Sequence, residues 1–169
     1  ITPVSLDHME MLGDTLGEIA REKAGILKAG VPAVIGPQEP EALEVIEQKA
    51  AETGATLIVA GRDYDAFEQN GRLVFQSETR LLDLPLPALV GRHQITNAGV
   101  AVAAALAVDA PRIDEEAIAR GVANARWPAR FERLDTGALV SLAGEHTEVW
   151  LDGGHNPAAG AALAQSLAE

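Results

Sequence analysis

Apolar runs of strand length alternate with amphipathic stretches of helical period along residues 1–60. This alternation is typical of α/β proteins, in which helices connect parallel strands. Thr15 and Glu18 have the spacing of a capping box, and Gly30 is a stop signal after the first helical stretch. The pattern predicts strands at residues 1–6, 31–35 and 56–60, and helices at 15–28 and 40–52.

The pattern changes at residue 64, where polar positions become frequent. Asn70-Gly71 stands between two short apolar runs, which predicts an antiparallel hairpin within residues 64–80. Residues 84–90 contain two prolines and are expected to form an edge strand. The Ala-rich stretch 95–108 is apolar almost all round and predicts a buried helix, followed by a more polar helix at 113–124.

A second unit is expected after a break at Trp127-Pro128. Residues 139–142 and 148–151 have the apolar character of strands. Asn156 followed by Pro157 predicts the capped start of a final helix. We therefore place a domain boundary near residues 126–130, which divides the chain into 1–126 and 127–169.

Composition narrows the classes of function. The chain has 169 residues, 47% of them hydrophobic, and a formal net charge of -12, which argues against nonspecific binding to nucleic acid or anionic membranes. It has no cysteine, so disulfides and thiolate metal sites are excluded. No apolar run has the length of a transmembrane helix. The first residue is not Met and the last helical pattern has no stop signal, so we expect a segment of a longer protein.

Lys23 is a candidate functional residue because helical periodicity places it within an apolar stripe. The stripe consists of four residues of the predicted helix 15–28: Leu16, Ile19, Ala20 and Leu27. One interpretation is that the lysine extends to solvent or pairs with a carboxylate. The other is that burial lowers the pKa of its amine, which would make it a nucleophile able to form a carbamate, an oxygen ligand for a hard metal.

Asp7 and His8 are further candidates because they follow the predicted strand 1–6 directly. The carboxyl ends of parallel strands form the ligand sites of α/β proteins. A single histidine is more often structural, however, and Asp7 could cap the next turn. These two residues alone leave the function open.

Four ordered motifs together resemble the folylpolyglutamate and dihydrofolate synthases, within the wider muramyl-peptide ligase superfamily. The first combines Leu6-Asp7-His8 with Glu22-Lys23-Ala24-Gly25-Ile26. The others lie at residues 91–98, 127–132 and 151–157, so the resemblance spans the chain. It implies that residues 1–126 are part of a P-loop-type central ATPase domain, with a parallel sheet and a small antiparallel insert. Residues 127–169 would be a hinge and the start of a Rossmann-like C-terminal ligase domain.

The resemblance also implies site residues. His8 would be a ligand of a second Mg²⁺, and Lys23, as a carbamate, would support that ion; both are the candidate catalytic residues. The nucleotide would be bound by Asn97 at the base or ribose, Arg130 at the phosphates, and Asp152 with His155 from across the cleft.

The implied reaction is the ATP-dependent addition of L-glutamate to a folate through an acyl phosphate. The implied small molecules are ATP, Mg²⁺, folate and L-glutamate, without nucleic acid or membrane, in a cytoplasmic and monomeric protein. Dihydrofolate synthase activity is left open.

Two departures from the family pattern are conservative: Ala129 replaces Gly and Gly154 replaces Ala. A third is not, because the motif Gly-x-x-x-x-Gly-Lys-[Ser/Thr] of a phosphate-binding loop does not occur in the sequence. We therefore expect this segment by itself to be inactive. The alternatives are a noncatalytic α/β module that binds a nucleotide or a partner, or a different muramyl-peptide-type ligase.

Overall fold

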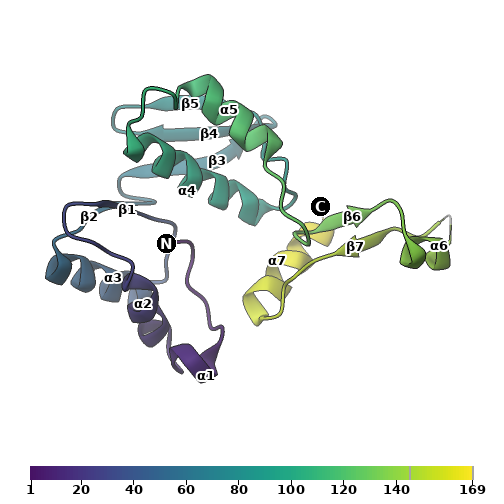
Figure 1. Cartoon of the computed structure of the whole chain (residues 1–169), viewed down its shortest axis with the longest axis horizontal. Helices are drawn as coiled ribbons and strands as arrows, with labels where there is room; N and C mark the ends of the chain where they lie inside the picture. The colour runs from purple at the N-terminus through teal and green to yellow at the C-terminus, as the bar shows by residue number, and fades with distance from the viewer. Residues whose placement is uncertain (145, 169) are drawn as a thin grey trace.

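The structure is a computed structural model that describes residues 1–144 and 146–168. The chain combines helices with a parallel pair of strands and a small antiparallel sheet, which confirms the α/β class (Figure 1). The strands are β1 (Pro32–Ile35), β2 (Thr56–Val59), β3 (Tyr64–Gln69), β4 (Arg72–Ser77), β5 (Leu81–Leu84), β6 (Glu132–Leu134) and β7 (Val149–Leu151). The helices are α1 (Met9–Leu12), α2 (Leu16–Ala24), α3 (Pro40–Thr53), α4 (Arg92–Val108), α5 (Glu115–Asn124), α6 (Ala138–Ala143) and α7 (Pro157–Leu167).

The parallel pair β1–β2 lies between two hydrophobic cores. Alternate residues of a strand point to opposite faces, so neighbouring side chains of β1 enter different cores. Ile35 is fully buried against α2 and α3, whereas Val34 packs with α4 and the three-stranded sheet. The first part of the chain is therefore a sheet covered by helices on both faces, as the crossover spacing predicts.

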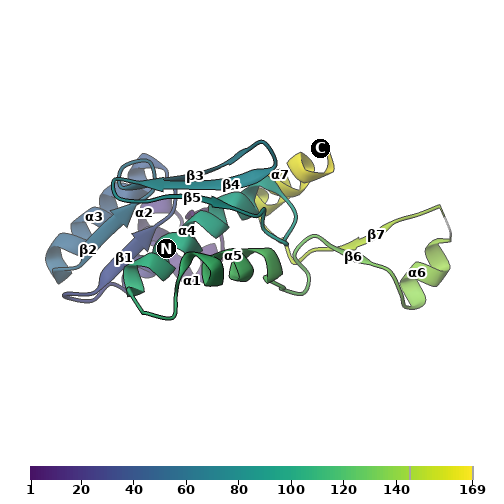
Figure 2. The ribbon, with the colours of Figure 1, turned by 90° about the horizontal axis from the view of Figure 1, so that it is seen from above.

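The antiparallel sheet β3–β4–β5 confirms the predicted hairpin. Asn70 and Gly71 connect β3 to β4 and both have positive φ, 54° and 72°, as a tight turn between twisted strands requires. Helices α4 and α5 lie along one face of this sheet (Figure 2). Phe75 and Leu84 are among the fully buried residues that attach the sheet to these helices.

The prediction of a strand at residues 1–6 is wrong. The segment lies beside β1, where the Ile1 amino group donates to the Val34 carbonyl and Gly36 N–H donates to the Ile1 carbonyl. Pro3 has no N–H to continue the ladder. The N–H of Val4 turns instead to the side chain of Gln38.

Three other predictions need correction. Residues 84–90 do not form a strand, because β5 ends at Leu84, just before Pro85. Residues 139–142 lie in α6, a helix rather than a strand, since a four-residue apolar run does not distinguish the two. Helix α4 is not buried all round: Gly99 and Val102 are buried, but Ala101 and Val108 are exposed.

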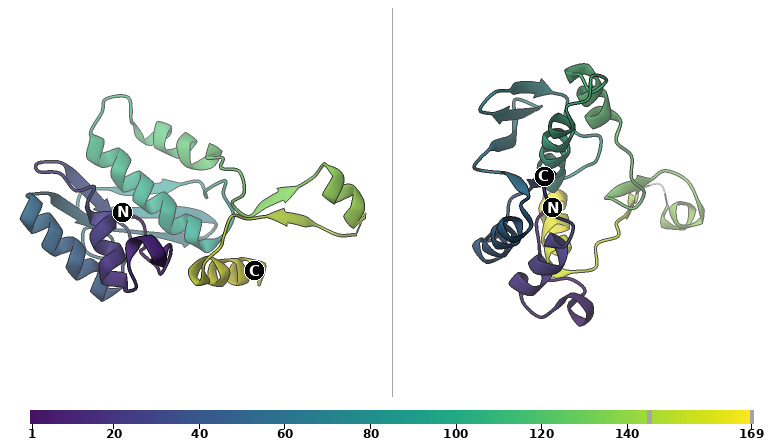
Figure 3. Two further views of the ribbon diagram at one scale, coloured as in Figure 1. Left: turned by 60° about the horizontal axis from the view of Figure 1, so that its bottom comes forward. Right: turned by 60° about the vertical axis from the view of Figure 1, so that its left-hand side comes forward.

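The elements after residue 126 extend in two directions. The antiparallel pair β6–β7, with α6 at its end, projects away from the other elements, whereas α7 returns towards α4 (Figure 3). Stacking of Phe131 on Trp150, with ring centroids 4.6 Å apart, holds the base of this projection. Among the described helices, none has the length and hydropathy needed to span a membrane.

Candidate functional site

Asp152 connects the segment after α5 to the turn after β7. Its Oδ2 accepts a hydrogen bond from Phe131 N–H at 2.7 Å, and its Oδ1 accepts one from Gly154 N–H at 2.6 Å. The N–H of Gly153 donates to the Ala129 carbonyl at 2.9 Å. Two hydrogen bonds therefore join the turn that carries His155 to the predicted hinge, and the bond from Gly154 N–H holds the turn itself.

The guanidinium group of Arg130 lies beside Gly153 in this turn. A Cβ added to Gly153 would lie 3.0 Å from Arg130 Nη1, so the absence of a side chain at 153 leaves room for the guanidinium group. Ala129 and Phe131, which flank the arginine, both have positive φ, 55° and 47°. Such φ values are unfavourable for residues with a Cβ, so strain is concentrated around Arg130.

The first turn of α4 contributes a polar chain of three side chains. Asn97 Nδ2 donates to Gln94 Oε1 at 3.1 Å, which leaves the Gln94 amide nitrogen to donate to His93 Nε2 at 3.0 Å. In this arrangement the His93 proton is on Nδ1, and that atom is buried without a partner among the described residues. The network fixes the Asn97 side chain and supplies one unused donor beside it.

Helix α7 begins at the same place. The side chain of Asn156 accepts a hydrogen bond from Ala159 N–H at 2.8 Å, which confirms the predicted cap. A Cβ on Gly154 would lie 2.9 Å from the Ala159 Cβ and 2.8 Å from Asp152 Oδ1. The turn packs so closely on α7 that little room is left for a Cβ at position 154, which is one of the two conservative departures.

These elements enclose a cavity of about 260 Å³. It is lined by the four residues predicted to bind the nucleotide, together with residues of α7 and Asp7: Asp7, His93, Gln94, Asn97, Arg130, Asp152, Gly153, Gly154, His155, Asn156, Ala159, Ala162 and Leu163. The structure therefore brings together residues from α4, from the segment between α5 and β6 and from the turn after β7.

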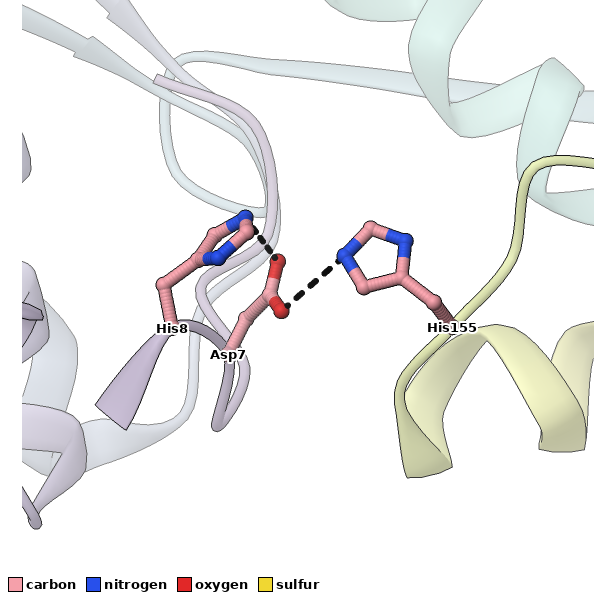
Figure 4. Close-up of side chains that lie close together, drawn as sticks. All are labelled: Asp7, His8 and His155. Atoms are coloured by element: carbon pink, nitrogen blue, oxygen red, sulfur yellow. Dashed lines mark ion pairs between the residues drawn. The ribbon is translucent and has the colours of Figure 1, made fainter. Parts of the chain in front are cut away.

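Asp7, His8 and His155 form a cluster at the edge of this cavity (Figure 4). Oδ2 of Asp7 lies 3.6 Å from His8 Nε2, and Oδ1 lies 3.4 Å from His155 Nε2. The centroids of the two imidazole rings are 5.4 Å apart. Desolvation opposes ionisation of Asp7, but a hydrogen bond from Asn156 and the two nearby histidines outweigh it and hold the pKa of Asp7 below its ordinary value.

Lys23 is not part of this site. Its stripe neighbours Ile19, Ala20 and Leu27 are buried, but the lysine itself is exposed and does not line the cavity. Of the two interpretations of Lys23, the structure agrees with the one in which the long side chain extends to solvent from the apolar stripe.

Sequence reasoning did not select His93 or Gln94 as site residues, and it named Asp7 as a candidate without giving it a role in the site. His93 and Gln94 lie within the motif at residues 91–98, which also contains Asn97. Two polar side chains in the first turn of an otherwise apolar helix could have indicated a site. Asp7 was recognised only as a neighbour of His8. Its position between two histidines depends on the return of α7, which no local pattern indicates.

No protein-family model matches the chain. The chain is 40% identical over 181 residues to a probable bifunctional folylpolyglutamate synthase/dihydropteroate synthase of Haloferax volcanii, and the match covers 100% of this chain but 20% of that protein.

Two solved structures are similar in fold. One is a complex of folylpolyglutamate synthase with AMPPCP and folate, with a TM-score of 0.80 and 31% identity, covering 99% of this chain and 40% of that one. The other is a bifunctional folylpolyglutamate synthase/dihydrofolate synthase with Mn, AMPPNP and L-glutamate bound, with a TM-score of 0.80 and 34% identity, covering 98% of this chain and 37% of that one. The chain thus spans less than half the length of each.

Proposed function

Because the chain is related over its whole length to one segment of the folylpolyglutamate and dihydrofolate synthases, we propose that it forms part of an ATP-dependent amide ligase. The ligase adds L-glutamate to the glutamyl carboxylate of a folate. ATP phosphorylates that carboxylate to give an acyl phosphate and ADP. The amine of glutamate then attacks the acyl carbon, and phosphate leaves as the amide forms.

The observation that carries this proposal is the convergence of Asn97, Arg130, Asp152 and His155 on one cavity. These residues come from both proposed domains, 1–126 and 127–169, so a nucleotide in the cavity would contact both. The guanidinium group of Arg130 is a permanent cation with planar donors, which suits a phosphate group. Asn97, fixed by Gln94, supplies a polar group suited to a base or ribose.

Asp152 has a different part in the proposed site. Both of its oxygens already accept backbone N–H groups, so it positions Arg130 and His155 in addition to any contact with the nucleotide. His155 is exposed at the edge of the cavity, with Nε2 turned to Asp7. These two residues would then complete the nucleotide site from the C-terminal side.

A divalent cation would offset the charge of the transferred phosphate and the carboxylate. Mg²⁺ prefers oxygen ligands. Around His8 the described residues offer one carboxylate, from Asp7, and two imidazoles, so this cluster fits Mg²⁺ poorly. The exposed Lys23 as a carbamate is kept as a proposed ligand to be tested, and no step is assigned to it.

The complete ligase would include a phosphate-binding loop from outside this segment, and the segment by itself is proposed to be inactive. The substrates ATP, folate and L-glutamate follow from the relatives, whose solved complexes contain AMPPCP, folate, AMPPNP and L-glutamate. A cytoplasmic location and a monomeric state belong to the same proposal.

The proposal is tested with a ligase that contains this segment together with its P-loop region. ADP release should require both tetrahydrofolate and L-glutamate. Arg130→Ala should lower kcat/KM for ATP by on the order of a hundredfold. Arg126→Ala is the matched control, since Arg126 is exposed and does not line the cavity, and it should leave the rate unchanged.

The ligase proposal is wrong if addition of folate and glutamate causes no release of ADP. A noncatalytic nucleotide-binding module is distinguished by isothermal titration of the 169-residue chain with ATP and Mg²⁺. Tight binding by this chain alone would favour that module, because the ligase proposal expects weak or no binding without a phosphate-binding loop.

A further inference from the structure

A chain of hydrogen bonds between three side chains at the start of α4 ends at the cavity. Gln94, only 5% exposed, is its middle member: its Nε2 donates to His93 Nε2 at 3.0 Å, and its Oε1 accepts from Asn97 Nδ2 at 3.1 Å. All three residues line the cavity. A buried polar side chain that is hydrogen-bonded on both sides keeps one orientation, so this chain determines what Asn97 offers to a ligand.

We propose that His93 and Gln94 are positioning residues that make the cavity prefer adenine nucleotides to guanine nucleotides. They do so by fixing the orientation of the side-chain amide of Asn97. The inference deepens the proposed function and rests on it, because that function places the base of a nucleotide beside Asn97.

The direction of each hydrogen bond in the chain follows from the one before it. His93 Nε2 accepts from Gln94, so the amide nitrogen of Gln94 is turned to the ring and its oxygen is turned to Asn97. That oxygen can only accept, so Asn97 must turn its Nδ2 towards Gln94. The Oδ1 of Asn97 is left without a partner among the described residues, and it is therefore the atom that a base can use first.

Ser166 of α7 supports this direction of the chain. Its Oγ donates to the Ala162 carbonyl at 2.9 Å, so the lone pairs of Oγ remain available. A Cβ added to Gly91 would lie 2.9 Å from His93 Nδ1 and 2.7 Å from Ser166 Oγ, so both atoms lie on the same side of Gly91. Oxygen lone pairs near Nδ1 favour the tautomer with the proton on that nitrogen, which keeps His93 Nε2 as an acceptor.

Adenine and guanine differ in the group at position 6 of the purine. Adenine carries an amino group there, which donates, and guanine carries a carbonyl oxygen, which accepts. An Asn97 amide fixed with Oδ1 towards the base accepts from the adenine amino group and repels the guanine oxygen. An amide that rotated freely would turn Nδ2 to guanine and would bind both bases. The preference therefore depends on the two residues that fix Asn97 as well as on Asn97 itself.

The experiment measures dissociation constants for ADP and GDP by isothermal titration, with the protein that contains this segment together with its P-loop region. The unchanged protein should bind ADP about tenfold to a hundredfold more tightly than GDP. His93→Phe keeps a ring but removes the acceptor, and Gln94→Met keeps an unbranched side chain but removes both hydrogen bonds. Each should lower the preference for ADP at least fivefold, with a gain in affinity for GDP that a damaged site would not show.

Gln94→Glu is the conservative variant. Its carboxylate still accepts from Asn97, and it accepts from His93 when the ring proton moves to Nε2, so the preference for ADP should be retained. Thr96→Ser is the matched control, because Thr96 lies in the same helix and does not line the cavity, and both dissociation constants should be unchanged. Circular dichroism checks that each variant is folded.

Three results would overturn the proposal. The first is equal affinity of the unchanged protein for ADP and GDP, or no binding of ADP at all. The second is an unchanged preference for ADP in both His93→Phe and Gln94→Met. The third is a loss of preference in Gln94→Glu as large as in Gln94→Met. The titrations contain no folate or L-glutamate, so failure of the ligase assay together with normal ADP binding would count against the proposed function alone.

Discussion

The backbone N–H of Phe131 donates to Oδ2 of Asp152 at 2.7 Å, which attaches the segment between α5 and β6 to the turn after β7. Gly153 and Ala129 add a second bond between the same two segments. Hydrogen bonds therefore hold the backbone on both sides of Arg130. The position of Arg130 at the cavity is determined by the backbone of residues 129–131 and by Asp152.

Ala129→Gly is expected to stabilise the chain. The φ of 55° at Ala129 costs an L-residue with a Cβ about 1 to 2 kcal/mol, and glycine does not have this cost. Greater freedom of glycine in the unfolded chain offsets about 0.4 to 1 kcal/mol of the gain. The net increase in the free energy of unfolding should be up to about 1 kcal/mol, measured by urea denaturation.

The control for that variant is Ala125→Gly. Ala125 has a φ of -58°, at which alanine is unstrained, so glycine should lower stability by about 0.4 to 1 kcal/mol. Equal destabilisation by both substitutions would contradict the assignment of strain to position 129.

Tyr64 should make the fold sensitive to alkaline pH. Burial raises the pKa of Tyr64 to about 12, and its hydroxyl donates to the Ile35 carbonyl at 3.2 Å. A raised pKa means that the unfolded state releases the phenolic proton first, so the stabilising contribution is full below pH 10 and is lost as pH rises towards 12. Ultraviolet absorption should show one phenol titrating near pH 12, because the chain has a single tyrosine.

Tyr64→Phe separates this effect from general alkaline unfolding. At neutral pH the variant should lose about 0.5 to 1.5 kcal/mol through the missing hydrogen bond. Between pH 10 and 12 its stability should fall less than that of the unchanged chain. A parallel decline of the two proteins would show that Tyr64 is not the group responsible.

Thr15→Ala should destabilise α2. The Thr15 hydroxyl accepts a hydrogen bond from Glu18 N–H at 3.2 Å, and the Glu18 carboxylate accepts one from Thr15 N–H at 3.2 Å. Loss of the capping hydroxyl should lower the free energy of unfolding by about 1 kcal/mol in thermal denaturation. Thr15→Ser keeps the hydroxyl and should remain within a few tenths of a kcal/mol of the unchanged chain.

Lys23→Gln should separate stability from activity. Because Lys23 is exposed, the substitution should change the free energy of unfolding of the 169-residue chain by less than about 0.5 kcal/mol. In the ligase with its P-loop region, the same change should abolish most of the ADP release if Lys23 acts as a carbamate. Full activity of Lys23→Gln would eliminate the carbamate proposal.

Carbamylation is tested separately with ¹³C-labelled bicarbonate and NMR of the 169-residue chain. No carbamate signal is expected without a bound cation to offset the negative charge that carbamylation would add to the exposed Lys23. A carbamate signal in the metal-free chain, absent from Lys23→Gln, would contradict this expectation.

The features that the sequence determined are local ones. The capping box of Thr15, the turn at Asn70-Gly71 and the cap at Asn156 are each formed by residues within a few positions of each other. Their hydrogen bonds and backbone angles depend little on the rest of the molecule, so the residue types alone predict them. The alternation of strands and helices, and hence the fold class, follows from the same short-range patterns.

The tertiary structure decided which elements cover or pair with each predicted helix and strand. Periodicity placed Lys23 in an apolar stripe, but exposure depends on which elements cover the stripe, and the end of its side chain is uncovered. The apolar run at residues 139–142 is compatible with a strand or a helix. It forms part of α6, because none of the described strands pairs with it at the end of the projection. The meeting of Asp7 with His155 likewise needs α7 to return to α4, because a contact between the two ends of a chain has no local signal in its sequence.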